Sequence, residues 1–83
     1  MVDIYTKNYC PYCMKAKTLL KSLDVEYTEH DITDTPEKIK ELSEKSGLMT
    51  VPQIFVGEKC LGGYSDIAKL HEEGKLIDLL KSS

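Results

Sequence analysis

The sequence has no arginine, and all 11 of its basic residues are lysines. Bidentate clamping of a carboxylate or phosphate by a guanidinium group is therefore excluded throughout the chain. The formal net charge of −3 also argues against nucleic acid as a partner, because phosphate binding needs clustered positive charge. No apolar run approaches the roughly 20 residues that span a bilayer, so we expect no membrane partner.

Cysteine is scarce, with only Cys10, Cys13 and Cys60 among 83 residues. This odd, low count does not fit a secreted disulfide framework. The first ten residues lack the basic start and apolar stretch of a signal peptide, so we expect a cytoplasmic protein. A cysteine pair in that compartment is more often catalytic or metal-binding than structural. The length predicts a single domain, residues 1–83.

Apolar periodicity and turn residues predict an α/β domain with the element order β-α-β-α-β-β-α. The first β-α-β unit implies a parallel strand pair with a right-handed crossover, and a later hairpin adds antiparallel strands. Helices on both faces of this four-stranded mixed sheet give a three-layer α/β/α architecture. The expected strands are residues 2–6, 25–32, 53–56 and 59–61, and the expected helices are 10–23, one from 33–37 to 46–47, and 64–80 with an interruption at 74.

Local signals mark where the second helix and the hairpin begin and end. Asp34 or Thr35 is expected to cap the second helix, with Pro36 in its first turn. Gly47 suits the left-handed position that follows a helix. Gly57 and Glu58 are expected to form the tight turn of the hairpin.

The motif that carries chemistry is Cys10-Pro11-Tyr12-Cys13, between the first predicted strand and the helix after it. A helix N-terminus carries partial positive charge and unpaired N–H groups, which stabilise a thiolate on Cys10. Pro11 is preset for the first helical position. The i, i+3 spacing puts Cys13 one turn deeper, close enough to close a disulfide with Cys10. The motif predicts a redox site with Cys10 as nucleophile and Cys13 as resolving thiol.

Two other interpretations of this cysteine pair remain open. A structural zinc site needs four ligands, but the motif supplies two, and Cys60, His30 and His71 lack ligand spacing. We therefore expect no metal. The pair could also be two unreactive buried thiols, against which the proline and the strand–helix context both stand.

Four stretches together resemble the dithiol glutaredoxin family, and the small bacterial members in particular. The resemblance covers essentially all 83 residues. It implies a thioredoxin fold, in agreement with the predicted order of elements. The implied activity is reduction of protein disulfides and glutathione mixed disulfides, with glutathione as co-substrate. The four stretches are Tyr5-Thr6-Lys7, Cys10-Pro11-Tyr12-Cys13, Thr50-Val51-Pro52 and Gly62-Gly63-Tyr64-Ser65-Asp66.

The resemblance also implies a glutathione site. A cis bond before Pro52 would turn the Val51 backbone toward the cysteine of glutathione. Lys7 would meet the glycine carboxylate, and Asp66 the ammonium group at the other end. Leu48-Met49 stand where family members often carry Arg or Gln, which implies that the contact to the glycine carboxylate is either weaker or rests on lysine alone. The implied set is Lys7, Tyr12, Thr50, Val51, Pro52, Gly63, Ser65 and Asp66, with Lys38 or Lys40 as a further candidate.

The implied partners are glutathionylated proteins and protein disulfides, with ribonucleotide reductase among the candidate substrates. Glutathione reductase would act indirectly, by regenerating glutathione, and the size suggests a monomer. Three alternative functions remain: a redoxin reduced by thioredoxin reductase, a redox sensor without turnover, and an iron–sulfur carrier. Pro11 argues against the carrier, since cluster-binding members usually have a different residue there. We expect Cys60 to be a packed core thiol.

Overall fold

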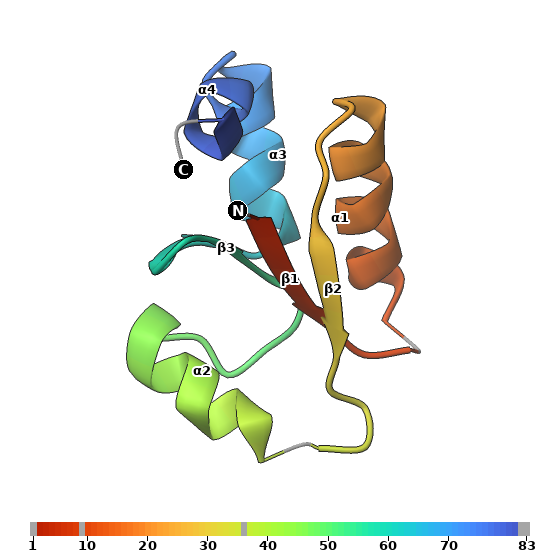
Figure 1. Ribbon diagram of the computed structural model, residues 1–83, viewed down its shortest axis with the longest axis vertical. Helices are drawn as coiled ribbons and strands as arrows, with labels where there is room; N and C mark the ends of the chain where they lie inside the picture. Colours follow the sequence, from red (N-terminus) through yellow and green to blue (C-terminus); the bar gives the residue numbers. More distant parts are fainter. Residues whose placement is uncertain (1, 9, 36, 82–83) are drawn as a thin grey trace.

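The computed structural model describes residues 2–8, 10–35 and 37–81. Within these residues the predicted element order is confirmed, with the final helical region divided near Gly74 into two helices (Figure 1). The elements are β1 (Val2–Thr6), α1 (Pro11–Ser22), β2 (Thr28–Asp31), α2 (Lys38–Ser46), β3 (Gln53–Val56), β4 (Lys59–Gly62), α3 (Tyr64–Glu72) and α4 (Leu76–Lys81).

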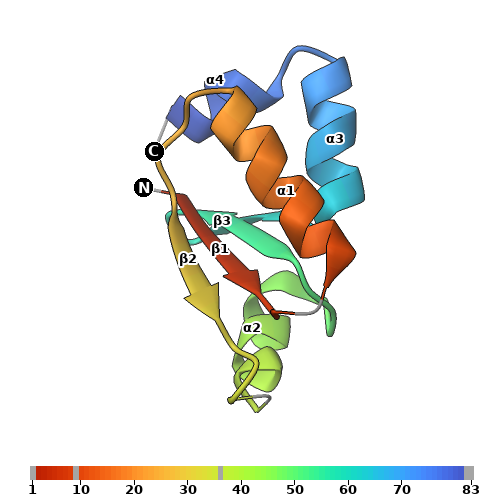
Figure 2. The same cartoon turned by 90° about the vertical axis from the view of Figure 1, so that its right-hand side faces the viewer.

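The four strands form one mixed sheet in the order β2-β1-β3-β4. The β1–β2 pair is parallel, whereas β1–β3 and β3–β4 are antiparallel. Helices α1 and α3 lie on one face of the sheet and α2 on the other (Figure 2). The three-layer α/β/α thioredoxin fold is therefore confirmed, and β1, which leads into the Cys-x-x-Cys motif, is a central strand.

The two faces of the sheet bury separate apolar cores because side chains alternate along each strand. Val2 and Ile4 point into the larger core, beneath α1, α3 and α4. Tyr5 points the other way and packs against the smaller core beneath α2, whose buried members include Phe55. Truncating a fully buried residue such as Ile4 to alanine typically costs about 2–5 kcal/mol. The larger core therefore anchors α1 firmly against β1.

Two predicted boundaries were wrong. The second strand is only Thr28–Asp31, because its parallel ladder to β1 runs from Asp3 to Thr6. Residues 25 and 27 pack against the larger core from the segment that precedes the strand. Helix α2 begins at Lys38 after Glu37, so neither predicted cap residue occupies the N-cap position.

The segment before α2 forms turns instead of a capped helix start. The Thr35 N–H donates to the Ile32 carbonyl at 3.1 Å, and the Thr35 carbonyl accepts from Lys38 N–H at 3.0 Å. The prediction for Pro36 lies outside the described residues. At the other end of α2, Gly47 has the predicted left-handed conformation, with φ of 77°.

Candidate active site

Cys10 is the N-cap of α1, and Pro11 follows as the first helical residue. The Cys10 carbonyl accepts from Met14 N–H at 3.3 Å, while its own N–H donates to the Lys7 carbonyl at 3.3 Å. Cys10 is partly exposed, and its Sγ lies 3.8 Å from the carbonyl oxygen of Val51, to which it donates. The unpaired N–H groups and partial positive charge of the helix end act on this sulfur.

Cys13 is buried, with only 1% of its surface exposed. Burial raises the pKa of its thiol to about 12, partly offset by a backbone hydrogen bond with Lys7. The neighbouring Cys10 thiol raises the same pKa further, through a side-chain hydrogen bond and through its charge. All three cysteines of the chain are free thiols in this structure. The pair is therefore asymmetric, with an accessible sulfur at the helix end and a protonated one beneath it.

The raised pKa of Cys13 makes the stability of the reduced protein depend on alkaline pH. The unfolded thiol ionises near its ordinary value of 9.0, whereas the folded thiol holds its proton to about 12. Between these values the folded state binds more protons, so stability falls as pH rises. We expect the urea midpoint of the reduced protein to drop more than that of Cys13→Ala between about pH 8 and pH 10. Equal drops in the two urea midpoints would show that burial of the Cys13 thiol does not contribute to the pH dependence of stability.

A groove of about 490 Å³ lies beside Tyr12, within the range of small-molecule sites. Lys7 is the one predicted glutathione residue that does not line it, and neither Lys38 nor Lys40 does. Leu48 and Tyr64 also line it, although neither was predicted as a glutathione contact; Tyr64 lies within the predicted stretch 62–66, and Leu48 lies two residues before Thr50. The predicted residues that line the groove are Tyr12, Thr50, Val51, Pro52, Gly63, Ser65 and Asp66.

One wall of the groove is the segment before β3. The Val51–Pro52 peptide bond is cis, as the resemblance implied. Gln53 is fully buried, and its Nε2 donates to the carbonyls of Leu48 at 3.0 Å and Thr50 at 2.9 Å. This amide thus ties both ends of the short loop to the first residue of β3, which fixes the backbone that faces Cys10.

The opposite wall is the β4–α3 junction. Gly63 is the N-cap of α3, and its N–H donates to Asp66 Oδ2 at 3.0 Å. A Cβ added to Gly63 would lie 3.3 Å from the Pro52 carbonyl oxygen, so the two walls meet closely at this point. Gly62 has φ of 107°, a conformation that residues with a side chain rarely adopt. The turn that presents Ser65 and Asp66 to the groove therefore depends on glycine.

Two lysines contact partners within their own helices. Lys38 pairs with Glu41 within α2, with Nζ 2.7 Å from Oε2. Lys15, on the lysine-rich face of α1, holds its Nζ 5.2 Å from the centre of the Tyr12 ring, a cation–π contact at the edge of the groove. The sequence offered no signal for this contact, because exposed lysines on a helix are ordinarily solvated.

The remaining thiol and His30 take structural positions. Cys60 is partly buried against the smaller core, and its Sγ accepts from Gly62 N–H at 3.3 Å. Burial raises the pKa of this thiol. His30 stacks on Tyr5 and lies 2.9 Å from an Asp3 carboxylate oxygen. Across residues 2–8, 10–35 and 37–81, no three His, Cys, Asp or Glu side chains gather as a metal site, and no helix could cross a membrane.

The chain is similar to known glutaredoxins in both sequence and structure. A family model described as Glutaredoxin matches residues 2–61. The chain is 44% identical over 81 residues to a glutaredoxin of Pseudomonas aeruginosa, covering 98% of this chain and 96% of that protein. It is 45% identical over 80 residues to glutaredoxin 3 of Escherichia coli K12, covering 96% of each. A solved buckwheat glutaredoxin–glutathione complex matches with a TM-score of 0.90 and 30% identity, over 98% of this chain and 76% of that one.

Proposed function

Because the chain belongs to the glutaredoxin family, we propose that Cys10 is its nucleophile and Cys13 its resolving thiol. Proteins of this family are glutathione-dependent thiol–disulfide oxidoreductases, and so is this chain. The observation that carries the assignment of roles is the asymmetry of the two sulfurs. Cys10 is partly exposed at the start of α1 beside the groove, whereas Cys13 is 1% exposed and protonated.

Removal of glutathione from a glutathionylated protein needs only the sulfur of Cys10. The Cys10 thiolate attacks the glutathione sulfur of a glutathionylated protein, and the bond between that sulfur and the protein breaks. The protein leaves as a thiolate and takes up a proton, while Cys10 retains glutathione as a mixed disulfide. A second glutathione attacks the glutathione sulfur of this intermediate, which releases oxidised glutathione and restores the Cys10 thiolate.

Reduction of a protein disulfide uses both cysteines. Cys10 attacks one sulfur of the substrate, and Cys13 then attacks Cys10. The second attack expels the fully reduced substrate and leaves a Cys10–Cys13 disulfide, so two electrons pass to the substrate. Two glutathione molecules reduce the bridge and leave as oxidised glutathione.

The proposed glutathione pose uses both walls of the groove. The cysteine of glutathione pairs with the Val51 main chain, in the manner of a short added strand. Its γ-glutamyl carboxylate binds the N–H groups at the start of α3, and its ammonium binds Asp66. Lys7 reaches the glycine carboxylate from outside the groove lining. The groove dimensions and the glutathione complex of the buckwheat relative support this pose.

The proposal extends to partners and location. We assign the activity to a single domain, residues 1–83, that works as a cytoplasmic monomer without metal, membrane or nucleic acid. Its substrates are protein disulfides, ribonucleotide reductase among them, and glutathionylated proteins. Glutathione reductase maintains the glutathione pool on which turnover depends. The net charge of −3 and the full-length match to bacterial glutaredoxins support these assignments.

The test of this function is NADPH oxidation with a glutathionylated peptide as substrate. We expect fast turnover with glutathione and glutathione reductase, and none with thioredoxin reductase alone. Turnover only with thioredoxin reductase would retain Cys10 as nucleophile and reject the glutathione site. Slow turnover with both reductants would favour a redox sensor.

Replacing Asp66 by asparagine tests the ammonium contact without removing the Gly63 hydrogen bond, since the amide oxygen can still accept it. We expect the KM for glutathione to rise about fivefold with kcat nearly unchanged, because an exposed ion pair contributes about 1 kcal/mol. Asp78→Asn on α4 is the matched control, because it makes the same charge change on an exposed residue outside the groove lining. An unchanged KM in Asp66→Asn would remove this residue from the glutathione site.

A further inference from the structure

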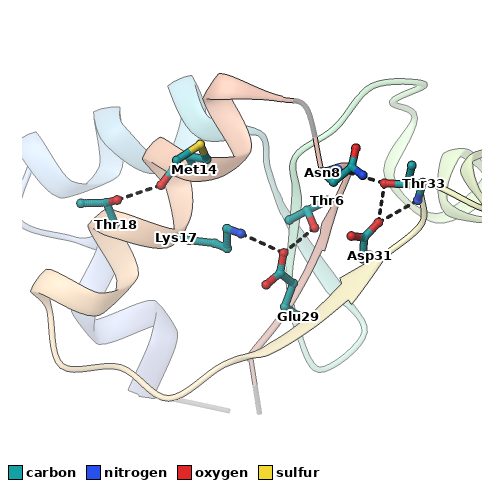
Figure 3. Close-up of polar contacts among 8 residues, drawn as sticks. All are labelled: Thr6, Asn8, Met14, Lys17, Thr18, Glu29, Asp31 and Thr33. Atoms are coloured by element: carbon teal, nitrogen blue, oxygen red, sulfur yellow. Dashed lines mark hydrogen bonds and ion pairs between the residues drawn. The ribbon is translucent and has the colours of Figure 1, made fainter.

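A polar cluster joins α1, β1 and β2 beside the active site (Figure 3). Glu29 Oε2 accepts a hydrogen bond from the Thr6 hydroxyl at 2.7 Å and also lies 2.9 Å from Lys17 Nζ. Thr6 is buried, with 1% exposure, whereas the side chains of Lys17 and Glu29 are 28% and 36% exposed. The carboxylate is thus held in place from the core side by a hydroxyl and from the solvent side by an ammonium.

Lys17 lies four residues after Cys13 on the same helix, so the two side chains share one face of α1. Glu29 approaches this face from β2, where it stands opposite Ile4 of β1. The mechanism proposed above uses neither charge. We propose that Lys17 and Glu29 are positioning residues that set the rate of the Cys13 attack, the ammonium favouring the Cys13 thiolate and the carboxylate partly neutralising that ammonium. This inference rests on the proposed role of Cys13.

The electrostatic surroundings of Cys13 support this geometry. Among the described residues, the ionisable side chains that act on its thiol are Cys10, which raises the pKa, and Lys17, which lowers it. Lys17 is in turn faced by Glu29 and by Tyr27, and its own pKa is raised, chiefly by the hydrogen bond to Glu29. The pKa of Glu29 is lowered, first by the Thr6 hydroxyl and then by Lys17, while Asp31 opposes this. The electrostatic interactions therefore run in series from Glu29 on β2, through Lys17, to the buried thiol of Cys13.

The step concerned is the second attack of the dithiol reaction. Cys13 loses its proton to solvent, its Sγ forms a bond to Cys10 Sγ, and the bond from Cys10 to the substrate sulfur breaks. The substrate leaves as a thiolate that takes up a proton. The rate rises with the fraction of Cys13 thiolate, and the lower nucleophilicity of a more acidic thiol offsets part of that gain.

The experiment isolates this step in the full chain. Reduced protein is mixed with a stoichiometric glutathionylated peptide and quenched with acid at intervals. Mass spectrometry then follows the conversion of the Cys10–glutathione intermediate into the Cys10–Cys13 disulfide, as a function of pH. We expect Glu29→Gln to accelerate this conversion about twofold or more at neutral pH, and Lys17→Met to slow it by a similar factor.

The opposite signs are decisive, because both variants break the same ion pair. A merely structural role would move both rates in the same direction, which would overturn the inference, as would no change in either. The differences should also shrink in high salt, because both side chains are partly exposed. Lys21→Met and Glu26→Gln are matched controls that change the same charges at exposed positions nearby, and we expect neither to alter the rate.

A further variant separates this inference from the proposed function. Cys13→Ser should leave the Cys10–glutathione intermediate unresolved in the same assay. If the intermediate still lost its glutathione, the role of Cys13 itself would be wrong, and the positioning role would be wrong with it. If it did not, but the Lys17 and Glu29 variants changed in the same direction, only the positioning role would be wrong.

Discussion

Cys10→Ser is expected to abolish both disulfide reduction and deglutathionylation, with losses of about a thousandfold or more, as for other nucleophile replacements. Cys13→Ser is expected to abolish only disulfide reduction. The physical reason is the unequal setting of the two sulfurs. Cys10 sits partly exposed at a helix N-terminus, 3.8 Å from the backbone of the groove wall. Cys13 is buried and protonated, so it can act only on a disulfide already formed at Cys10.

The measurement is steady-state turnover with two substrates, a glutathionylated peptide and a protein disulfide, each with glutathione and glutathione reductase. Cys60→Ser serves as the matched control, because it replaces the third free thiol without touching the proposed machinery. We expect that variant to retain both activities. Loss of deglutathionylation in Cys13→Ser, together with its survival in Cys10→Ser, would reverse the two roles.

Gly62→Ala is expected to destabilise the protein by about 2–4 kcal/mol and to raise the KM for glutathione about tenfold. Two physical effects add at this position. The residue has φ of 107°, which a side chain tolerates poorly. An added Cβ would also lie 2.7 Å from Asp66 Cγ and 2.8 Å from Asp66 Cβ, so Asp66 would have to move. The hydrogen bond from Gly63 N–H and the proposed ammonium contact would then both be weakened.

Gly57→Ala is the matched control for this prediction. Gly57 also has a positive φ, of 63°, but an added Cβ there meets nothing within 4 Å. We expect it to lower stability by about 1 kcal/mol and to leave the KM unchanged. Urea unfolding and glutathione saturation curves measure the two quantities. Equal behaviour of the two variants would show that the contact with Asp66 is unimportant.

Sequence patterns predicted what depends on near neighbours in the chain. The start of α1 at Cys10 and Pro11 follows from a local preference of proline, and the left-handed Gly47 follows from the same kind of rule. The start of α2 was mispredicted because two possible capping residues precede a turn, and local propensity could not show that the turn comes first. The extent of β2 was mispredicted because the ladder to β1, rather than its own sequence, limits it.

The residues that line the groove also divide into those predicted from the sequence and those found only in the structure. The predicted stretches contributed every lining residue except Leu48, although Tyr64, which lies within one of these stretches, was not itself predicted as a glutathione contact. Leu48 belongs to the wall because buried Gln53 holds its carbonyl, a contact that forms only once the loop folds back onto β3. Lys7, predicted to meet the glycine carboxylate, lies outside the lining, and its long flexible side chain lets it approach a ligand from a neighbouring loop.

The sequence was sufficient to locate the cysteine pair, the order of the elements and most of the residue stretches that form the two walls. Each of these depends on neighbours along the chain or on a short motif with fixed spacing. Only the tertiary structure decided that Cys13 is buried enough to hold its proton, and that Lys17 meets Glu29 rather than solvent. Burial and ion pairing depend on contacts between distant segments, and with 11 lysines and 14 acidic residues in the chain, spacing alone could not single out that pair.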